Sequence, residues 1–145
     1  MIAVGPIKQA FVRALRDIDD LKSAVGSAGI DEGVSPPDSS YPRVVYSLAS
    51  YAPDRAYGSE GIGIATIDCW AVSDIQVVAN SLDQLMLDGL ENVSLDYSDI
   101  DAVDGNEPST LLCRRLLSLS LVELDDAGNR VFRVGGTYQI WNDRI

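Results

Sequence analysis

The sequence contains no histidine and only two cysteines, and both shortages restrict the chemistry available to it. Histidine is the commonest general base and metal ligand near neutral pH, so its absence argues against most hydrolases and zinc enzymes. Cys69 and Cys113 lie inside strand-like runs and form no CxxC pair. We interpret them as small buried hydrophobic residues, with a disulfide across neighbouring strands as the alternative. We expect no cofactor and no metal.

Positive charge is missing from the middle of the chain. No Lys or Arg occurs between Ala56 and Cys113, and the formal net charge of the whole chain is −11. A surface of this charge repels phosphate backbones, so tight binding of nucleic acid is not expected. The acidic residues of this segment are Glu60, Asp68, Asp74, Asp83, Asp88, Glu91, Asp96, Asp99, Asp101, Asp104 and Glu107.

Long apolar runs are absent too. No stretch approaches the roughly 20 apolar residues that cross a membrane. The start, MIAVGPIKQAFVRAL, lacks a basic segment followed by an apolar one, so we expect no membrane association and a cytoplasm-like compartment. With 145 residues, 46% of them hydrophobic, the chain is expected to form a single domain over residues 1–145.

The stretch from Gly61 to Leu90 changes its hydrophobic period in the middle. It alternates like a strand up to Ala71 and then shows helical spacing, which predicts a strand followed directly by a helix over residues 73–90. Ser73 is predicted to cap this helix. The strand has a helix-facing side of Ala65, Ile67, Cys69 and Ala71, and an opposite side of Ile62, Ile64, Thr66, Asp68 and Trp70.

Ile64 and Trp70 are unusual on a strand face that does not meet the helix. Large apolar residues on such a face indicate that something covers it. Two alternatives are open, namely a neighbouring subunit or the C-terminal strands of the same chain.

The remaining pattern predicts an α+β fold, with a mainly antiparallel sheet of four or more strands, two helices packed on one face, and a C-terminal hairpin. We expect Thr110–Leu121 to be a central or near-central strand, with Leu117, Leu119 and Leu121 in phase with Leu111 and Cys113. Gly135-Gly136 is expected to break the last strands apart, and Asp68 to pair with the core-side member of Arg114-Arg115. The predicted elements are a helix at 6–25, an irregular connection at 27–41 pinned by Ile30 and Val34, a hairpin at 43–72, a helix at 73–90, strands at 93–122 and a hairpin at 123–145.

Motifs that would carry catalysis or ion binding fail on their spacing. The acids from Asp96 to Asp104 do not supply the ligand positions of a calcium loop in any frame. Gly61 and Gly63 open a strand and are not followed by a phosphate-binding pattern. Ser118 and Ser120 have no histidine to activate them.

Four pieces of the chain, in this order and spacing, resemble the tail completion or tail terminator proteins of long-tailed bacteriophages. They are FVRALRDIDDLKSAVG, YPRVVYS, the joint ATIDCWAVSDIQVVANSLDQLMLDGL and the late strand LLCRRLLSLSLV, spanning Lys8 to Val122. IDCWA followed by an apolar-rich helix is the most specific of them. The chain departs from the family pattern after Val122, which leaves open where the outer edge of a ring would lie.

The resemblance implies a structural virion protein and not an enzyme. It implies a ring of copies, expected to be a hexamer, that ends polymerisation of the major tail tube protein and joins the head connector, with DNA passing through. Candidate interface or lumen residues are Ile64, Trp70, Trp141, Glu60, Asp99, Asp101 and Asp104. Trp141 either anchors an interface or completes the sheet, and the acids are expected to line the bore.

Three other readings remain open. A head-completion or stopper protein of the connector belongs to the same class. An acidic binding module that imitates nucleic acid would share the charge, but it would stay monomeric and bind a basic partner. An acid–base enzyme that uses Asp or Glu is the third.

Overall fold

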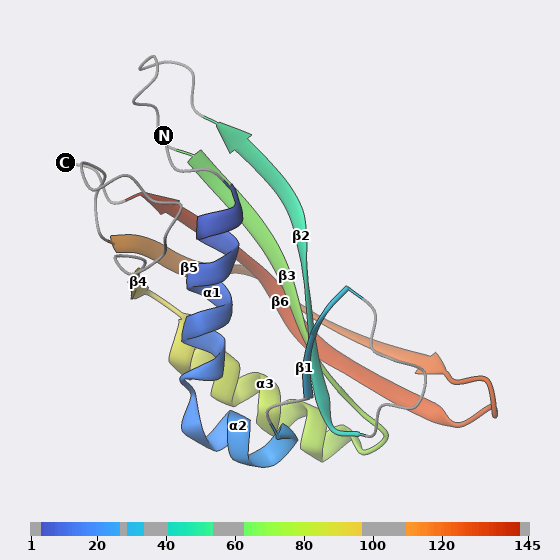
Figure 1. Cartoon of the computed structure of the whole chain (residues 1–145). Helices are drawn as coiled ribbons and strands as arrows, with labels where there is room; N and C mark the ends of the chain where they lie inside the picture. The colour runs from blue at the N-terminus through green and yellow to red at the C-terminus, as the bar shows by residue number, and fades with distance from the viewer. Residues whose placement is uncertain (1–3, 27–28, 34–40, 54–62, 97–109, 143–145) are drawn as a thin grey trace.

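The computed structural model describes residues 4–26, 29–33, 41–53, 63–96 and 110–142, which form an α+β fold of three helices and one mixed sheet (Figure 1). The six strands lie in the order β1-β2-β3-β6-β5-β4, and all neighbours are antiparallel except β1 and β2. The elements are α1 (Val4–Arg16), α2 (Asp19–Val25), β1 (Ile30–Glu32), β2 (Arg43–Pro53), β3 (Gly63–Ser73), α3 (Gln76–Leu90), β4 (Val93–Asp96), β5 (Thr110–Leu124) and β6 (Arg130–Asn142).

The main core lies between the helices and one face of the sheet, as Figure 1 shows. Apolar residues recur every three or four positions along α1 and α3, so each helix turns one continuous stripe toward the sheet. Opposite them, the predicted helix-facing side of β3 is completely buried, which confirms its orientation. The central core residues are Ile7, Phe11 and Leu15 of α1, Ala79, Leu82, Met86 and Leu90 of α3, and Ala65, Ile67, Cys69 and Ala71 of β3.

The predicted helix over residues 6–25 is in fact two helices. Ile18 adopts an extended conformation with ψ 97°, which ends α1 and starts α2. Its side chain lies against Gly89 of α3, where a Cβ atom would sit 2.6 Å from Ile18 Cδ1. Asp19 and Asp20 then fall in the first turn of α2, where acidic side chains are favourable. Helical spacing alone continues across this break, so the periodicity did not reveal it.

The segment predicted as an irregular connection contains the short edge strand β1, which pairs in parallel with β2. Ile30 is buried, as expected for a residue that pins this segment to the core. Val34 lies outside the described residues. At the other joint, α3 begins at Gln76 with Ile75 as N-cap, and Ser73 is not the cap. The Ser73 hydroxyl instead accepts a hydrogen bond from the Ile75 N–H at 3.1 Å.

The last two strands, β5 and β6, form one long hairpin, whereas the predicted hairpin lay within residues 123–145. β6 lies between β3 and β5, so β5 is next to the short edge strand β4 and is not at the centre of the sheet. Gly135-Gly136 does not break β6, which runs without interruption through both. A Cβ at Gly135 would lie 2.1 Å from the carbonyl oxygen of Cys69, so only glycine lets β6 approach β3 this closely.

β5 contains a register shift between Arg115 and Leu117, where Leu116 is the extra residue of a β-bulge. Arg115 is opposite Tyr138, and Leu117 is opposite Thr137. Because the bulge reverses the alternation, the side chains after it change faces. The predicted phase is therefore wrong: Leu111 and Cys113 are buried beneath the helices, and Leu117, Leu119 and Leu121 lie on the opposite face of the sheet.

Candidate assembly surface

The face of the sheet that points away from the helices, here called the outer face, brings together three of the predicted interface residues. Ile64 of β3 is directly opposite Trp141 of β6, and directly opposed residues of an antiparallel pair point to the same face. Trp70 lies on the same face, further along β3. β6 continues the sheet beside β3, so among the described residues it does not form a second layer over this face. Near Trp70, however, Val45, Val72 and Val131 are buried on this face, and Tyr41 and Trp70 pack against them. The C-terminal hairpin therefore covers part of the face through Val131.

Arginine side chains stack on both tryptophans of the outer face. The Arg133 Cζ atom lies 5.6 Å from the centre of the Trp70 ring, and the Arg114 Cζ atom lies 5.5 Å from that of Trp141. Glu123 also contacts Arg133, at 3.5 Å between Nη1 and Oε1. A guanidinium over an aromatic ring is attracted to the face of that ring. Trp and Arg are the residue types that most often dominate protein interfaces.

The remaining predicted site residues are not placed. Glu60, Asp99, Asp101 and Asp104 lie outside the described residues. Their assignment to a bore stays a prediction.

A charged cluster around Arg115 was only partly predicted from the sequence. Arg115 is the core-side member of the arginine pair, as expected, and only 4% of its side chain is exposed. Its partner is Asp83 of α3, not Asp68: the Nη1 and Oδ2 atoms are 3.0 Å apart, and Nη2 contacts Oδ1. Asp68 points to the outer face, where it accepts a hydrogen bond from the Thr137 hydroxyl at 2.7 Å.

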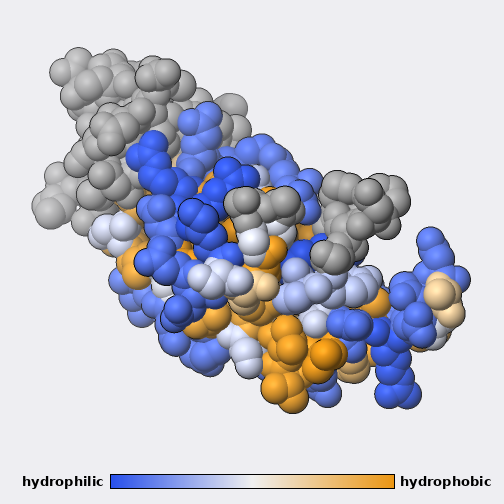
Figure 2. Space-filling view, turned by 60° about the horizontal axis from the view of Figure 1, so that its bottom comes forward, coloured by the Kyte–Doolittle hydropathy of each residue, from blue (hydrophilic) through white to orange (hydrophobic). Residues whose placement is uncertain are grey.

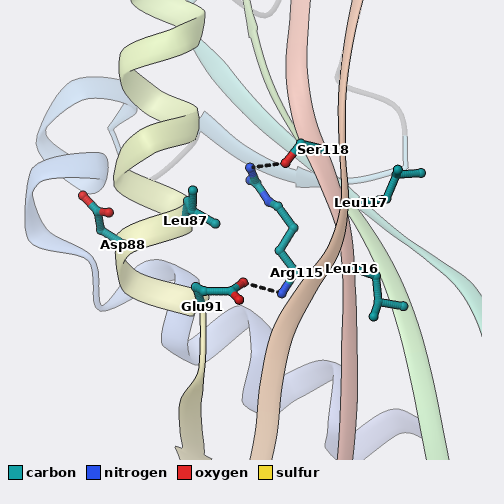
Figure 3. A pocket seen from close by; sticks show the side chains of 7 residues that line it. All are labelled: Leu87, Asp88, Glu91, Arg115, Leu116, Leu117 and Ser118. Carbon is teal, nitrogen blue, oxygen red and sulfur yellow. Dashed lines mark hydrogen bonds between the residues drawn. The ribbon is translucent and has the colours of Figure 1, made fainter.

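Arg115 connects three elements of the fold. Its Nη2 donates to the Tyr138 hydroxyl at 2.6 Å, and its backbone N–H donates to Glu91 Oε2 at the end of α3, also at 2.6 Å. Figure 3 shows the side chain pointing toward α3, whereas Leu116 and Leu117 point away from it. Burial alone lowers the pKa of Arg115, but the hydrogen bond to Asp83 and the adjacent Tyr138 raise it above its ordinary value.

A groove of about 540 Å³ opens beside this cluster, between the end of α3 and the bulge of β5 (Figure 3). Its lining residues are Leu87, Asp88, Glu91, Arg115, Leu116, Leu117 and Ser118. The terminal nitrogens of Arg115 already contact Asp83, Tyr138 and Ser118, so they are engaged within the fold. We therefore assign the cluster a structural role in holding β5 against α3.

The two cysteines are free and buried, which confirms the interpretation as small hydrophobic residues and rules out the disulfide. Burial raises the pKa of Cys69 far above its ordinary value and that of Cys113 to about 12. Cys69 donates a weak hydrogen bond to the Met86 sulfur at 3.6 Å. Both thiols stay protonated near neutral pH, so neither has the character of a nucleophile.

Exposed apolar side chains gather at the end of the β5–β6 hairpin, residues 116–132, here called the arm. In Figure 1 it projects beyond the helices. Figure 2 shows further hydrophobic side chains gathered where α3 begins, beside the base of the hairpin; Ile75 and Val77 are exposed there. The exposed apolar residues of the arm are Leu116, Leu117, Leu119, Leu121, Val122 and Leu124. Patches of this kind mark interaction sites.

Within the described part of the chain, no three His, Cys, Asp or Glu side chains are grouped so that they could hold a metal ion. None of the helices in those same ranges is long and apolar enough to span a membrane.

Neither a protein-family model nor a curated protein matches this sequence. Solved structures do match it. A chain of the structure described as the virion of a native gene transfer agent particle has a TM-score of 0.64 and 15% identity, and the match covers 96% of this chain and 97% of that one. A second solved structure matches over 100% of both chains, with a TM-score of 0.58 and 13% identity. At these identities the likeness establishes the fold, which this chain shares over nearly its whole length with a chain of a virion particle.

Proposed function

We propose that this protein is a structural component of a phage-like virion and, more specifically, a tail terminator. The observation that carries the proposal is the likeness to a chain of the gene transfer agent virion, which covers 96% of this chain and leaves no additional domain unmatched. The finer assignment to a terminator draws its support from the sequence resemblance between Lys8 and Val122 described above.

The surface features suit a protein that works by assembly. The arm exposes leucine and valine side chains to water, and Ile64 is exposed on the outer face. The two tryptophans of that face are half-buried beneath arginines. Exposure of apolar side chains to water costs free energy, and contact with other subunits removes that cost. The buried arginine cluster and the protonated thiols are engaged inside the fold, so the described residues supply no evident catalytic constellation.

In this proposal several copies close into a ring, expected to be a hexamer, on the last ring of the tail tube. The ring ends polymerisation of the major tail tube protein and presents the surface to which the head connector attaches. The protein thus resides at the head-proximal end of the tail in the virion, after assembly in the host cytoplasm. DNA passes through the ring without specific binding, since the net charge of −11 per copy repels phosphate.

Tube assembly tests the proposal directly. The major tail tube protein of the cognate phage is allowed to polymerise with and without this protein, and tube lengths are measured by electron microscopy. We expect shorter tubes of narrow length distribution with extra density at one end. A small acidic protein of similar net charge serves as the control for a non-specific charge effect.

Unchanged tube growth with bare tube ends would contradict the terminator assignment. Binding to the isolated head connector without any effect on tubes would favour the stopper protein instead. Monomeric behaviour with tight binding to a basic partner would favour the module that imitates nucleic acid.

A further inference from the structure

We propose that the arm of one copy pairs with the open edge of β2 in a second copy, so that copies join head to tail through a continuous sheet. This inference rests on the proposed function in one respect, because it describes the contact between neighbouring copies of the proposed ring. The contact itself is argued from strand edges, side-chain exposure and strand direction.

The first observation is the open edge of β5. β4 pairs with β5 only from Thr110 to Cys113. Beyond that point, as far as Leu124, β6 is the one strand beside β5 among the described residues. One exposed donor of this edge, the Arg115 N–H, is already bound to Glu91. The rest presents backbone groups that can pair with another strand.

The second observation is the composition of this edge. Leu116 to Val122 reads LLSLSLV and contains neither a charged residue nor a proline, the devices that usually protect an edge strand. The bulge sends Leu117, Leu119 and Leu121 to the outer face, while Val122 and Leu124 lie on the other side. The outer side of the arm is therefore apolar from Leu117 to Leu121, and the other side carries Ser118 and Ser120 before Val122 and Leu124. Copies that repel each other elsewhere can approach at this uncharged stretch.

The third observation is a matching open edge at the other side of the sheet. β1 pairs with β2 only from Val44 to Tyr46, so the described part of β2 from Ser47 to Pro53 has β3 as its one neighbour. The outermost strands, β1 and β4, are three and four residues long and offer little to pair with. Among the residues that the structure describes, each copy thus carries two long open edges, one on β5 and one on β2, on opposite sides of the sheet.

Strand direction makes these two edges compatible. Three successive antiparallel pairings separate β2 from β5, so the two strands run in opposite directions. A rotation about an axis roughly along the strands preserves their directions and can bring β5 of one copy beside β2 of the next as an antiparallel pair. The pairings put Ser50 level with Arg114 and Val44 level with Ser120. The arm therefore meets the open part of β2 when the next copy is also shifted along the strands by roughly 17 Å, the length of about five residues. Contacts of this kind use different surfaces on the two partners and can close into a ring. A stagger between the copies, as in barrels, accommodates the tilt of the strands.

Cross-linking between single-cysteine additions tests the pairing. Ser50→Cys places a thiol on the open part of β2, and Ser120→Cys places one on the arm; both serines are exposed. The two variants, distinguishable by a tag, are mixed and treated with a short bis-maleimide. The native cysteines are buried, so wild-type protein is the control for background.

We expect a cross-linked dimer that contains one copy of each variant, at least ten times more abundant than the products of either variant alone. A product from Ser120→Cys alone would show that two arms pair with each other and would overturn the head-to-tail contact. Absence of the mixed product at high protein concentration would overturn it as well.

A second test removes the apolar surface without touching the core. The variant Leu119→Lys/Leu121→Lys adds two charges to exposed positions of the arm. Its control, Ala24→Lys/Asn80→Lys, adds the same charge at exposed positions of α2 and α3 away from the arm. Size-exclusion chromatography with light scattering should show concentration-dependent association for wild type and the control, and only monomer for the arm variant. Equal association of all three would contradict the proposal.

The two proposals fail in different ways. If the arm variant and wild type shorten tail tubes equally and associate equally, the pairing is wrong and the terminator assignment stands. If the arm variant abolishes association but wild-type protein has no effect on tubes, the pairing stands and the terminator assignment is wrong.

Discussion

At the scale of single residues, Arg115 is the most consequential side chain of the described structure. It lies in the core beside the ring of Tyr138, and both oxygens of Asp83 contact its guanidinium. A buried ion pair adds little net stability compared with apolar residues, but removal of one partner leaves the other charge buried and unpaired. The cluster therefore fixes where β5 meets α3 more than it adds to the free energy of unfolding.

Replacement of Arg115 tests this reading. We expect Arg115→Met to lower the free energy of unfolding by about 3 kcal/mol, because Asp83 loses its partner. The double variant Arg115→Met/Asp83→Leu should recover more than half of that loss. Urea denaturation of wild type, the two single variants and the double variant gives the coupling free energy. A loss below about 1 kcal/mol for Arg115→Met, or no recovery in the double variant, would contradict the account.

Because the two thiols are buried, the free energy of unfolding should decrease at alkaline pH. The pKa of Cys113 rises from its ordinary 9.0 to about 12 in the folded protein because burial disfavours the thiolate. A raised folded-state pKa contributes stability that is complete below pH 9 and is lost as the pH rises toward 12. The free energy of unfolding should fall by about 1.4 kcal/mol per pH unit for this group over that window.

Cys69 and Tyr138 act in the same direction, since burial raises the pKa of each. Urea denaturation at intervals from pH 8 to pH 11 measures the slope, and Cys113→Ala should have a shallower one. A free energy of unfolding that stays constant between pH 8 and pH 10.5 would show that these groups are not buried as described.

At the scale of elements, β6 depends on its two central glycines. A Cβ at Gly135 would lie 2.8 Å from Trp70 Cα and even closer to the backbone of Cys69, and backbone atoms cannot move aside cheaply. At Gly136 the nearest backbone atom is the Leu117 carbonyl oxygen at 2.4 Å, next to the bulge. The glycines thus permit the close packing of β3, β6 and β5 at the point where the arm departs.

We expect Gly135→Ala to lower the free energy of unfolding by about 3 kcal/mol or more, through displacement of β6 from β3. Gly128 in the β5–β6 turn is the matched control: its φ is 83° and a Cβ there meets nothing within 4 Å. Gly128→Ala should therefore cost only about 1 kcal/mol, for backbone strain. Thermal or urea denaturation compares the two, and an equal effect would contradict the role assigned to Gly135.

Much of the element pattern could be predicted from local sequence. The β3–α3 joint and the buried side of β3 follow from a change in hydrophobic period, and Ile7, Phe11 and Leu15 follow from helical spacing. The break at Ile18 could not be predicted, because the packing of Ile18 against Gly89 is a tertiary contact. The β5 bulge could not be predicted either, since one extra residue reverses the phase without changing the composition.

Only part of the candidate surface could be predicted from the sequence. Ile64 and Trp70 stood out because large apolar residues occupied the side of a strand that faces away from a helix, and the structure places Trp141 beside Ile64. The arm was missed because its leucines looked like a core strand. Their charge-free run, LLSLSLV, was visible in the sequence, but whether a leucine is buried depends on which strands lie beside it.

At the scale of the whole molecule, the net charge of −11 sets how copies meet each other and DNA. Like charge resists association at long range, so contacts between copies are favoured where charge is locally absent, as proposed for the arm. In a ring of such copies the anionic field adds, and a wall of that sign would keep DNA from adhering. The acids proposed for the bore are Asp99, Asp101 and Asp104.

Neutralisation of these three acids tests the bore assignment. The triple variant Asp99→Asn/Asp101→Asn/Asp104→Asn should bind DNA at low salt in a filter assay, where wild type does not, and should slow DNA passage. The matched control is Asp20→Asn/Asp88→Asn/Asp126→Asn, which removes the same charge from exposed positions elsewhere. No difference between the triple variant and wild type would mean that these acids do not face the DNA path.

The proposed function depends on whether copies of this chain form a ring on the end of a tail tube. Electron microscopy of tail tubes from the cognate phage, incubated with purified protein and averaged at their ends, would reveal such a ring. We expect one closed ring of density at a single end of each tube, with the arm of each copy on its neighbour. Bare tube ends in the presence of excess protein, with the protein monomeric in solution, would contradict it.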